Sequence, residues 1–244
     1  MIFKKTLLLG GSGLLGNHFL NSNSFKNILA PPKKKVNLLN ISSISNFLVK
    51  NNIKIIINCA ALARMRECEH NPQKAIETNV EGSLNLINSI KKSNQKILIV
   101  HFSSDSVYGS KKFPFNEKSK LNPYNTYAWT KLSSEYIFRT YSNHIIIRTR
   151  FFHEDRMKFK DAATDIMTSA IHVNEIPSLV EKIIKSNFRG IINIGGKVES
   201  DFNKFKKFKI NLKKTTFNNI QKNLDYPLSQ FGILDSSLLK KIIK

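Results

Sequence analysis

A glycine-rich turn directly after an apolar run near the N-terminus constrains the fold more than any other feature. Leu7–Gly16 (LLLGGSGLLG) contains G-x-G-x-x-G starting at Gly11 and G-x-x-G-x-x-G starting at Gly10. Glycine permits the tight turn and a close approach to a pyrophosphate, and the following helix directs free N–H groups and its positive dipole end toward that anion. The strand before the turn and the helix after it favour a dinucleotide site over a purely structural glycine turn.

The rest of the chain alternates short aliphatic runs with longer amphipathic stretches. Strands are predicted over Lys5–Gly10, Asn27–Ala30, Lys54–Asn58, Lys96–Phe102, His144–Arg148 and Gly190–Ile194. Helices are predicted over Gly13–Asn21, Ser43–Lys50, Pro72–Lys92, Asn122 to about Tyr141, Glu175–Asn187 and at the end of Leu228–Ile243. The strands do not alternate with polar residues, which is typical of parallel strands covered by helices on both faces. The element order therefore predicts an α/β fold with a doubly wound parallel sheet of the Rossmann type.

The charge and apolar content of the chain restrict its partners. Its 244 residues carry a formal net charge of +22, which fits either an acidic partner or a lysine-rich proteome. The lysines are scattered and no nucleic-acid-binding module accompanies them, so we favour the second interpretation and expect no nucleic-acid partner. The same positive field would steer a phosphorylated substrate. No apolar run reaches about 18 residues, so no membrane insertion is expected.

Three further patterns bear on location and on metals. Met1–Leu9 resembles the start of a secretory leader, but the glycines after it interrupt the apolar stretch and no cleavage pattern follows. Cys59 and Cys68 provide no disulfide framework, so a cytoplasmic location is expected. The six histidines show no ligand spacing with these cysteines, and we predict no protein-built metal site.

The segment after the second predicted strand indicates which dinucleotide is bound. An NAD-preferring site places a carboxylate there to hold the ribose 2′-hydroxyl. In this chain the first acidic residue is Glu67, whereas Ala30 is followed by two prolines and then by Lys33, Lys34 and Lys35. Because lysines attract a 2′-phosphate, the sequence predicts NADP(H), with NAD(H) as the alternative. For any single lysine, a solvated loop position is the competing interpretation.

A serine, a tyrosine and a lysine form the candidate catalytic group. Ser103–Gly109 (SSDSVYG) follows the predicted strand Lys96–Phe102, and Tyr127–Lys131 spells Y-x-x-x-K. On a helix this spacing places both side chains on one face. Reduction of a carbonyl needs a proton donor, and a lysine cation would lower the tyrosine pKa from its usual value of about 10. The alternative is an amphipathic helix with a packed tyrosine and a solvated lysine.

These segments together resemble the extended short-chain dehydrogenase/reductase superfamily, and most of all its dTDP-4-dehydrorhamnose reductase group. The matching segments are Gly10–Gly16, Val36–Asn40 (VNLLN), Asn58–Ala61 (NCAA), Glu69–Gly82, Ser103–Gly109, Tyr127–Lys131 and Leu234–Lys240 (LDSSLLK). The resemblance implies a Rossmann domain over residues 1–151, with 175–194 completing its sheet. It also implies a small C-terminal substrate lobe from residues 152–174 and 195–244, and relatives suggest a homodimer.

The resemblance also implies a reaction and its residues. Hydride would pass from NADPH to the 4-keto carbon of a nucleotide-linked sugar, in the biosynthesis of activated deoxysugars and cell-surface polysaccharides. Tyr127 would donate the proton, Lys131 would bind the nicotinamide ribose, and Ser104 would hold the keto oxygen. Asp105 and Phe151 would lie at the sugar. The implied cofactor contacts are Gly10, Gly11, Ser12, Gly13, Leu14, Leu15, Lys33, Asn37, Leu38, Cys59, Ala60, Ala61, Tyr127 and Lys131.

Departures from the pattern keep other functions open. The region after Phe152 is shorter than usual, which favours a non-catalytic NADP-binding regulatory or scaffold subunit, although the intact serine, tyrosine and lysine argue against it. A 4,6-dehydratase would carry Asp-Glu where Asp105 is followed by Ser106, and one epimerase type would carry cysteine at position 105, so both are disfavoured. Asn37 replaces an acidic residue that contacts adenine in the family. Arg64 and Arg66 would reach a phosphate or a solvent-facing glutamate.

Overall fold

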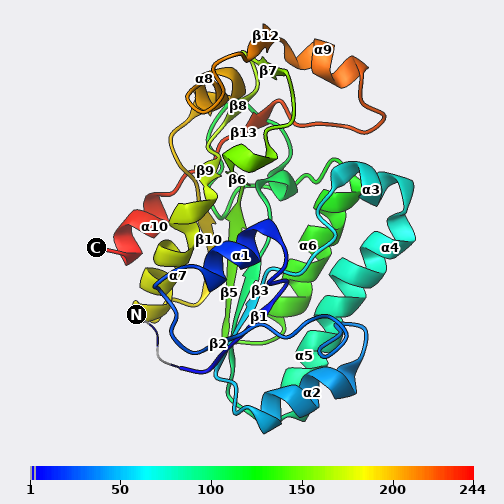
Figure 1. The fold of residues 1–244 in the computed structure, drawn as a ribbon, viewed down its shortest axis with the longest axis vertical. Coiled ribbons are helices and arrows are strands. Elements are labelled where there is room, and N and C mark those ends of the chain that lie inside the picture. The colour runs from blue at the N-terminus through cyan, green and yellow to red at the C-terminus, as the bar shows by residue number, and fades with distance from the viewer. Residues whose placement is uncertain (1, 3) are drawn as a thin grey trace.

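Six apolar segments form one parallel sheet with the strand order β10-β5-β4-β3-β1-β2 (Figure 1). The computed structural model describes residue 2 and residues 4–244, so residues 1 and 3 of the leader-like stretch lie outside the described part. The strands are β1 (Thr6–Leu9), β2 (Ile28–Leu29), β3 (Ile55–Asn58), β4 (Leu98–Phe102), β5 (His144–Thr149) and β10 (Gly190–Ile194). Apart from Thr149, each lies within the segment predicted for it, and the α/β Rossmann-type fold is confirmed.

Alternate residues of the central strands build a core on each face of the sheet. Leu8 and Ile147 belong to one core, and their neighbours Leu7 and Ile146 belong to the other. The first core is covered by α1 (Leu14–Leu20), α7 (Ile176–Lys185) and α10 (Ser237–Ile242). The second is covered by α2 (Ile41–Lys50), α5 (Gly82–Lys92) and α6 (Thr126–Arg139). The sheet is therefore buried on both faces, which explains why its strands are aliphatic throughout.

The predicted helix Pro72–Lys92 is interrupted. The structure has α4 (Pro72–Ile76), capped by Asn71 as its sequence indicates, then a π-helical turn over Glu77–Glu81, then α5. The π turn places the Asn79 side chain against the loop after β3, where its amide donates to the Leu62 carbonyl and accepts from the Leu62 N–H. These two hydrogen bonds stabilise the π turn, which inserts one residue into the helix. Helical periodicity in the sequence does not predict such an insertion.

The structure also differs from the prediction at α3 and at the start of α6. A short helix, α3 (Met65–His70), precedes α4 and was not predicted. Helix α6 begins at Thr126 rather than at Asn122, because the Asn125 side chain accepts a hydrogen bond from the Ala128 N–H and caps the first turn.

Smaller sheets lie beyond the carboxyl ends of the main sheet (Figure 1). They comprise β11 (Glu199–Ser200), β8 (Met167–Thr168) and β13 (Phe231–Gly232); β12 (Lys213–Thr215) and β7 (Asp161–Ala163); and β6 (Phe151–Phe152) and β9 (Ile171–His172). The weakly patterned stretch after Gly195 also holds α8 (Asp201–Lys206) and α9 (Phe217–Lys222). Helix α10 leaves this region, and its Leu239 is buried in the core of the main sheet. No helix within the described residues is long and apolar enough to cross a membrane.

A buried ion pair attaches α6 to the main sheet. The Arg148 guanidinium on β5 donates to both carboxylate oxygens of Glu135, the shortest distance being 2.6 Å from Nη2, and both side chains are almost fully buried. Arg148 also donates to the Tyr108 hydroxyl, and the Ser103 hydroxyl donates to Glu135. The pair therefore ties β5, α6 and the end of β4 together.

We expect Arg148→Met to lower the free energy of unfolding by about 3–5 kcal/mol, because it leaves the buried Glu135 carboxylate without its cation. Urea titration followed by circular dichroism measures the loss. Arg139→Met, which removes an arginine at the exposed end of α6, should change stability by no more than about 0.5 kcal/mol. Equal stability of the two variants would contradict the anchoring role.

Candidate active site

The carboxyl ends of four parallel strands meet at one edge of the sheet. The glycine turn follows β1, Cys59 follows β3, Ser103 and Ser104 follow β4, and Arg150 follows β5. The chain runs from β1 to β2 on one side and then crosses to β3 on the other side of β1. In open α/β sheets ligands bind outside the carboxyl ends at such a reversal of strand order. The predicted cofactor and catalytic residues therefore surround the position that the topology favours for a ligand.

The glycine turn is packed too closely for side chains. Gly10 has φ +80°, and a Cβ there would lie 2.7 Å from the Ala60 backbone nitrogen. A Cβ on Gly16 would collide with the Gly10 carbonyl oxygen. Gly13 precedes α1, and no described side chain caps that helix. The backbone of the turn can therefore approach a ligand, with the start of α1 directed toward it.

A cavity of about 660 Å³ lies against this turn. All the predicted cofactor residues line it except Leu14, Leu15, Tyr127 and Lys131. The Leu14 and Leu15 side chains pack into the core instead, which leaves their backbone as the part available to a ligand. Sequence reasoning missed Pro31, Pro32, Leu39 and Thr78 in the lining, although the prolines directly follow the second strand. The cavity is large enough for a small-molecule cofactor.

Ser104 lies in a 3₁₀ turn at the end of β4. Its hydroxyl accepts a hydrogen bond from the Ser106 hydroxyl at 2.7 Å and donates to the Asp105 carboxylate at 3.2 Å. The Ser104 hydroxyl also lies near enough to the Tyr127 phenol to lower its pKa. The structure thus brings Ser104 and Tyr127 together from two separate elements, as a shared catalytic role requires.

Tyr127 and Lys131 lie one turn apart on α6, but their pKa values differ from the expectation. Burial raises the pKa of Tyr127 above its ordinary value, and the Ser104 hydrogen bond offsets only part of this effect. Burial lowers the pKa of Lys131 to about 8, and its Nζ lies 3.4 Å from His101 Nε2. The pKa of Tyr127 is therefore raised and not lowered as predicted, because burial dominates and Lys131 is not among its causes. At neutral pH Tyr127 holds a proton that it can donate.

Arg150 is a site residue that the sequence did not single out. Its Nε lies 2.7 Å from the Asp105 Oδ2, and the Asp105 side chain is 3% exposed. A Cβ on Gly232 would collide with the same carboxylate, so β13 closes over the pair. Tyr124 stands beside Arg150, and burial raises the pKa of its hydroxyl to about 12. The position of Arg150 directly after β5 was the signal that could have revealed it.

The remaining predicted residues have more peripheral places. Phe151 lies in β6 and packs half-buried against the core, at the same strand end as Arg150. Arg66 pairs with the Asp225 carboxylate at 3.1 Å, and His70 approaches the same oxygen at 2.9 Å. Arg66 therefore meets a solvent-facing aspartate, where a phosphate or a glutamate was expected. This contact joins α3 to the segment that leads into β13.

The model of the RmlD substrate-binding domain matches residues 4–175 of the chain. The chain belongs to this family. UDP-glucuronate 4-epimerase 1 of Arabidopsis thaliana is 32% identical over 178 residues, 60% of this chain and 41% of that protein. Methionine adenosyltransferase 2 subunit beta of Bos taurus is 28% identical over 141 residues, 54% of this chain and 42% of that protein. The matched region thus spans less than half of each of these relatives.

The fold of this RmlD-family chain has solved counterparts. A dTDP-4-dehydrorhamnose reductase from Bacillus anthracis, solved in complex with NADP, superposes with a TM-score of 0.86 at 18% identity. The match covers 98% of this chain and 93% of that one. At this identity the likeness establishes a common fold over nearly the whole chain, including the smaller sheets.

The Lys131 amine should titrate with a midpoint near pH 8, because burial disfavours its charged form. Carbon NMR of the lysine side chains between pH 6 and 11 would follow the shift. Lys204, whose pKa burial also lowers to about 8, provides the second such signal. Lys131→Met should remove one of the two titrations and Lys204→Met the other. A Lys131 signal that moves only above pH 10 would contradict the burial described for it.

Proposed function

We propose that the chain is an NADP(H)-dependent reductase of a nucleotide-linked 4-keto sugar, similar in activity to dTDP-4-dehydrorhamnose reductase. The observation that carries the proposal is the meeting of Ser104 with a protonated Tyr127 at the strand ends beside the glycine-turn cavity. Membership of the RmlD family and the fold shared with reductases of this kind support it.

The cavity fits a nicotinamide dinucleotide. The backbone of Gly10–Gly13 would hold the pyrophosphate, since close packing forces glycine there and no described side chain occupies the start of α1. Asn37 and Leu38 would border the adenine, and Lys33 would attract a 2′-phosphate from the cavity rim. When bound, NADPH would supply the hydride for the reduction.

The side chains at the strand ends would have different roles in the reduction. Tyr127 would donate its phenolic proton to the carbonyl oxygen as negative charge develops there, and the Ser104 hydroxyl would hydrogen-bond the same oxygen. Lys131, buried one helical turn away, would bind the nicotinamide ribose and carry positive charge below about pH 8. Asp105 is held by Arg150, so this carboxylate would orient the sugar rather than act as a free acid.

Two other functions have specific support. The similarity to UDP-glucuronate 4-epimerase 1 favours an epimerase, which would oxidise and re-reduce one carbon without net use of NADPH. The similarity to a protein named as a subunit of methionine adenosyltransferase 2 favours a regulatory or scaffold subunit that binds the dinucleotide without turnover. The intact Ser104 and Tyr127 favour an enzyme over the subunit, and the fold shared with a dTDP-4-dehydrorhamnose reductase over nearly the whole chain favours the reductase over the epimerase.

Tyr127→Phe should lower turnover by about 10²–10⁴-fold while NADPH binding stays within about twofold, because only the proton donor is lost. Purified protein, NADPH and a panel of nucleotide-linked 4-keto sugars are followed by absorbance of the reduced nicotinamide. Tyr136→Phe, on the exposed face of the same helix, is the matched control and should be unchanged. Product formation without NADPH loss would favour the epimerase, and tight binding without turnover would favour the subunit.

Lys33→Glu should weaken NADPH binding about tenfold and NADH binding much less, because it places a negative charge where the 2′-phosphate would lie. Calorimetric titration with each dinucleotide gives the ratio of affinities. The matched control is Lys34→Glu, the same charge change at a neighbour outside the cavity lining. If the wild-type chain binds NADH more tightly than NADPH, the preference for NADP(H) is wrong.

A further inference from the structure

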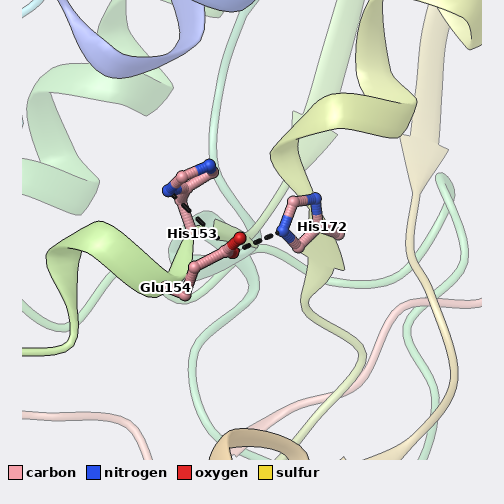
Figure 2. Close-up of side chains that lie close together, drawn as sticks. All are labelled: His153, Glu154 and His172. Carbon is pink, nitrogen blue, oxygen red and sulfur yellow. Dashed lines mark hydrogen bonds and ion pairs between the residues drawn. The ribbon is translucent and has the colours of Figure 1, made fainter. Parts of the chain in front are cut away.

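Two histidines and a glutamate that have no role in the proposed reaction lie close together (Figure 2). His153 follows β6, Glu154 begins the next 3₁₀ turn, and His172 ends β9. The parallel pairing of β6 with β9 sets Phe152 opposite His172 and so brings the two histidines to the same place. The histidine spacing predicted no metal site, because residues far apart in the sequence meet only through this pairing.

The side chains converge on a small volume. One potential ligand atom from each residue lies within 4.8 Å of the others, and His172 Nε2 is 2.8 Å from the Glu154 Oε2. His153 Nδ1 lies 3.9 Å from the same oxygen. The two imidazoles are largely shielded, at 12% and 18% side-chain exposure, whereas Glu154 is 43% exposed. A path from solvent to the cluster therefore exists along the carboxylate.

A third imidazole lies beside the cluster. His18 of α1 places its ring 5.0 Å from that of His153, between centroids, and the rings of His153 and His172 are 5.3 Å apart. Three imidazoles therefore gather around the Glu154 carboxylate, so nitrogen and oxygen donors lie together in one small volume.

We propose that His153, Glu154 and His172 bind one divalent transition-metal ion of the zinc class. Imidazole nitrogens and a carboxylate oxygen are common zinc ligands, whereas magnesium prefers oxygen donors throughout. Tetrahedral ligation at about 2.0–2.1 Å places ligand atoms about 3.3 Å apart. The separations of 2.8 Å and 3.9 Å from the Glu154 oxygen to the two imidazoles lie on either side of that value, so side-chain rotations can close the site.

Metal binding must open the 2.8 Å contact between His172 Nε2 and Glu154 Oε2 and displace the proton it shares. The backbone hydrogen bonds to the two imidazoles compete only weakly. His153 Nδ1 accepts from the Asp155 N–H at 3.2 Å, and His172 Nδ1 accepts from the Asn174 N–H at 3.3 Å. Both are long for N–H donors, so their loss on metal binding costs little. We expect a dissociation constant in the micromolar range, with solvent water completing the coordination.

The ion would connect the two ends of one segment of the chain. Residues 153–154 and 172 bound the segment that contains β7 and β8 of the smaller sheets. Metal binding would therefore fix the base of this segment against the main sheet, and the proposal is independent of the reductase activity. Because binding to the folded chain alone raises its stability, the melting temperature should rise with zinc concentration.

The test uses untagged full-length protein freed of metal by a chelator, at physiological ionic strength. Calorimetric titration should show one Zn²⁺ bound per chain, with binding weakened at least tenfold in each of His153→Ala, His172→Ala and Glu154→Gln. His70→Ala is the matched control, since it removes a half-exposed histidine that also contacts a carboxylate. This variant should bind Zn²⁺ as the wild type does.

Two further readouts separate a built site from loose surface binding. Co²⁺ should give visible absorption in the wild type that Glu154→Gln diminishes, and Mg²⁺ should neither compete with Zn²⁺ nor raise the melting temperature. Thermal melts without metal establish that each variant folds. The proposal is overturned if the wild type binds no Zn²⁺, if folded His153→Ala and His172→Ala variants bind it as tightly as the wild type, or if His70→Ala weakens binding equally.

Discussion

The close approach of the backbone at the end of β1 is the constraint on which the site depends. Gly10 adopts a positive φ against the backbone of Ala60, and Gly16 lies against the carbonyl of Gly10 with no room for a Cβ. These contacts bring the start of α1, the end of β1 and the end of β3 together. The glycines carry no side chain that would fill the space beside the turn. The absence of side chains thus explains both the close packing of the turn and its capacity for a ligand.

Helix α6 positions the other half of the site, which contains Tyr127 and Lys131. Tyr127, Lys131 and Glu135 follow one another at four-residue intervals, which places them on one face. Glu135 is held by Arg148 of β5 and by Ser103, which directly follows β4, so the same face that presents Tyr127 is attached to the sheet. Ser104 follows Ser103 directly and meets Tyr127. The buried ion pair of Arg148 with Glu135 thereby fixes the position of Tyr127 relative to Ser104.

The features that sequence reasoning predicted are those with local causes. The strands are aliphatic because both faces are buried, and the glycine turn is recognisable because no other residue fits it. Arg150 was missed because its pairing with Asp105 joins the ends of two strands. The meeting of His153 with His172 likewise depends on a strand pairing that periodicity does not encode. The direction of the shift in the Tyr127 pKa was mispredicted because burial, a tertiary property, dominates it.

The most direct test of the central claim is a crystal structure of the chain with NADPH. The account predicts the pyrophosphate against the backbone of Gly10–Gly13, the 2′-phosphate near Lys33, and the nicotinamide ring beside Tyr127 and Lys131. A dinucleotide bound away from the glycine turn, or with its nicotinamide directed away from Tyr127, would contradict it.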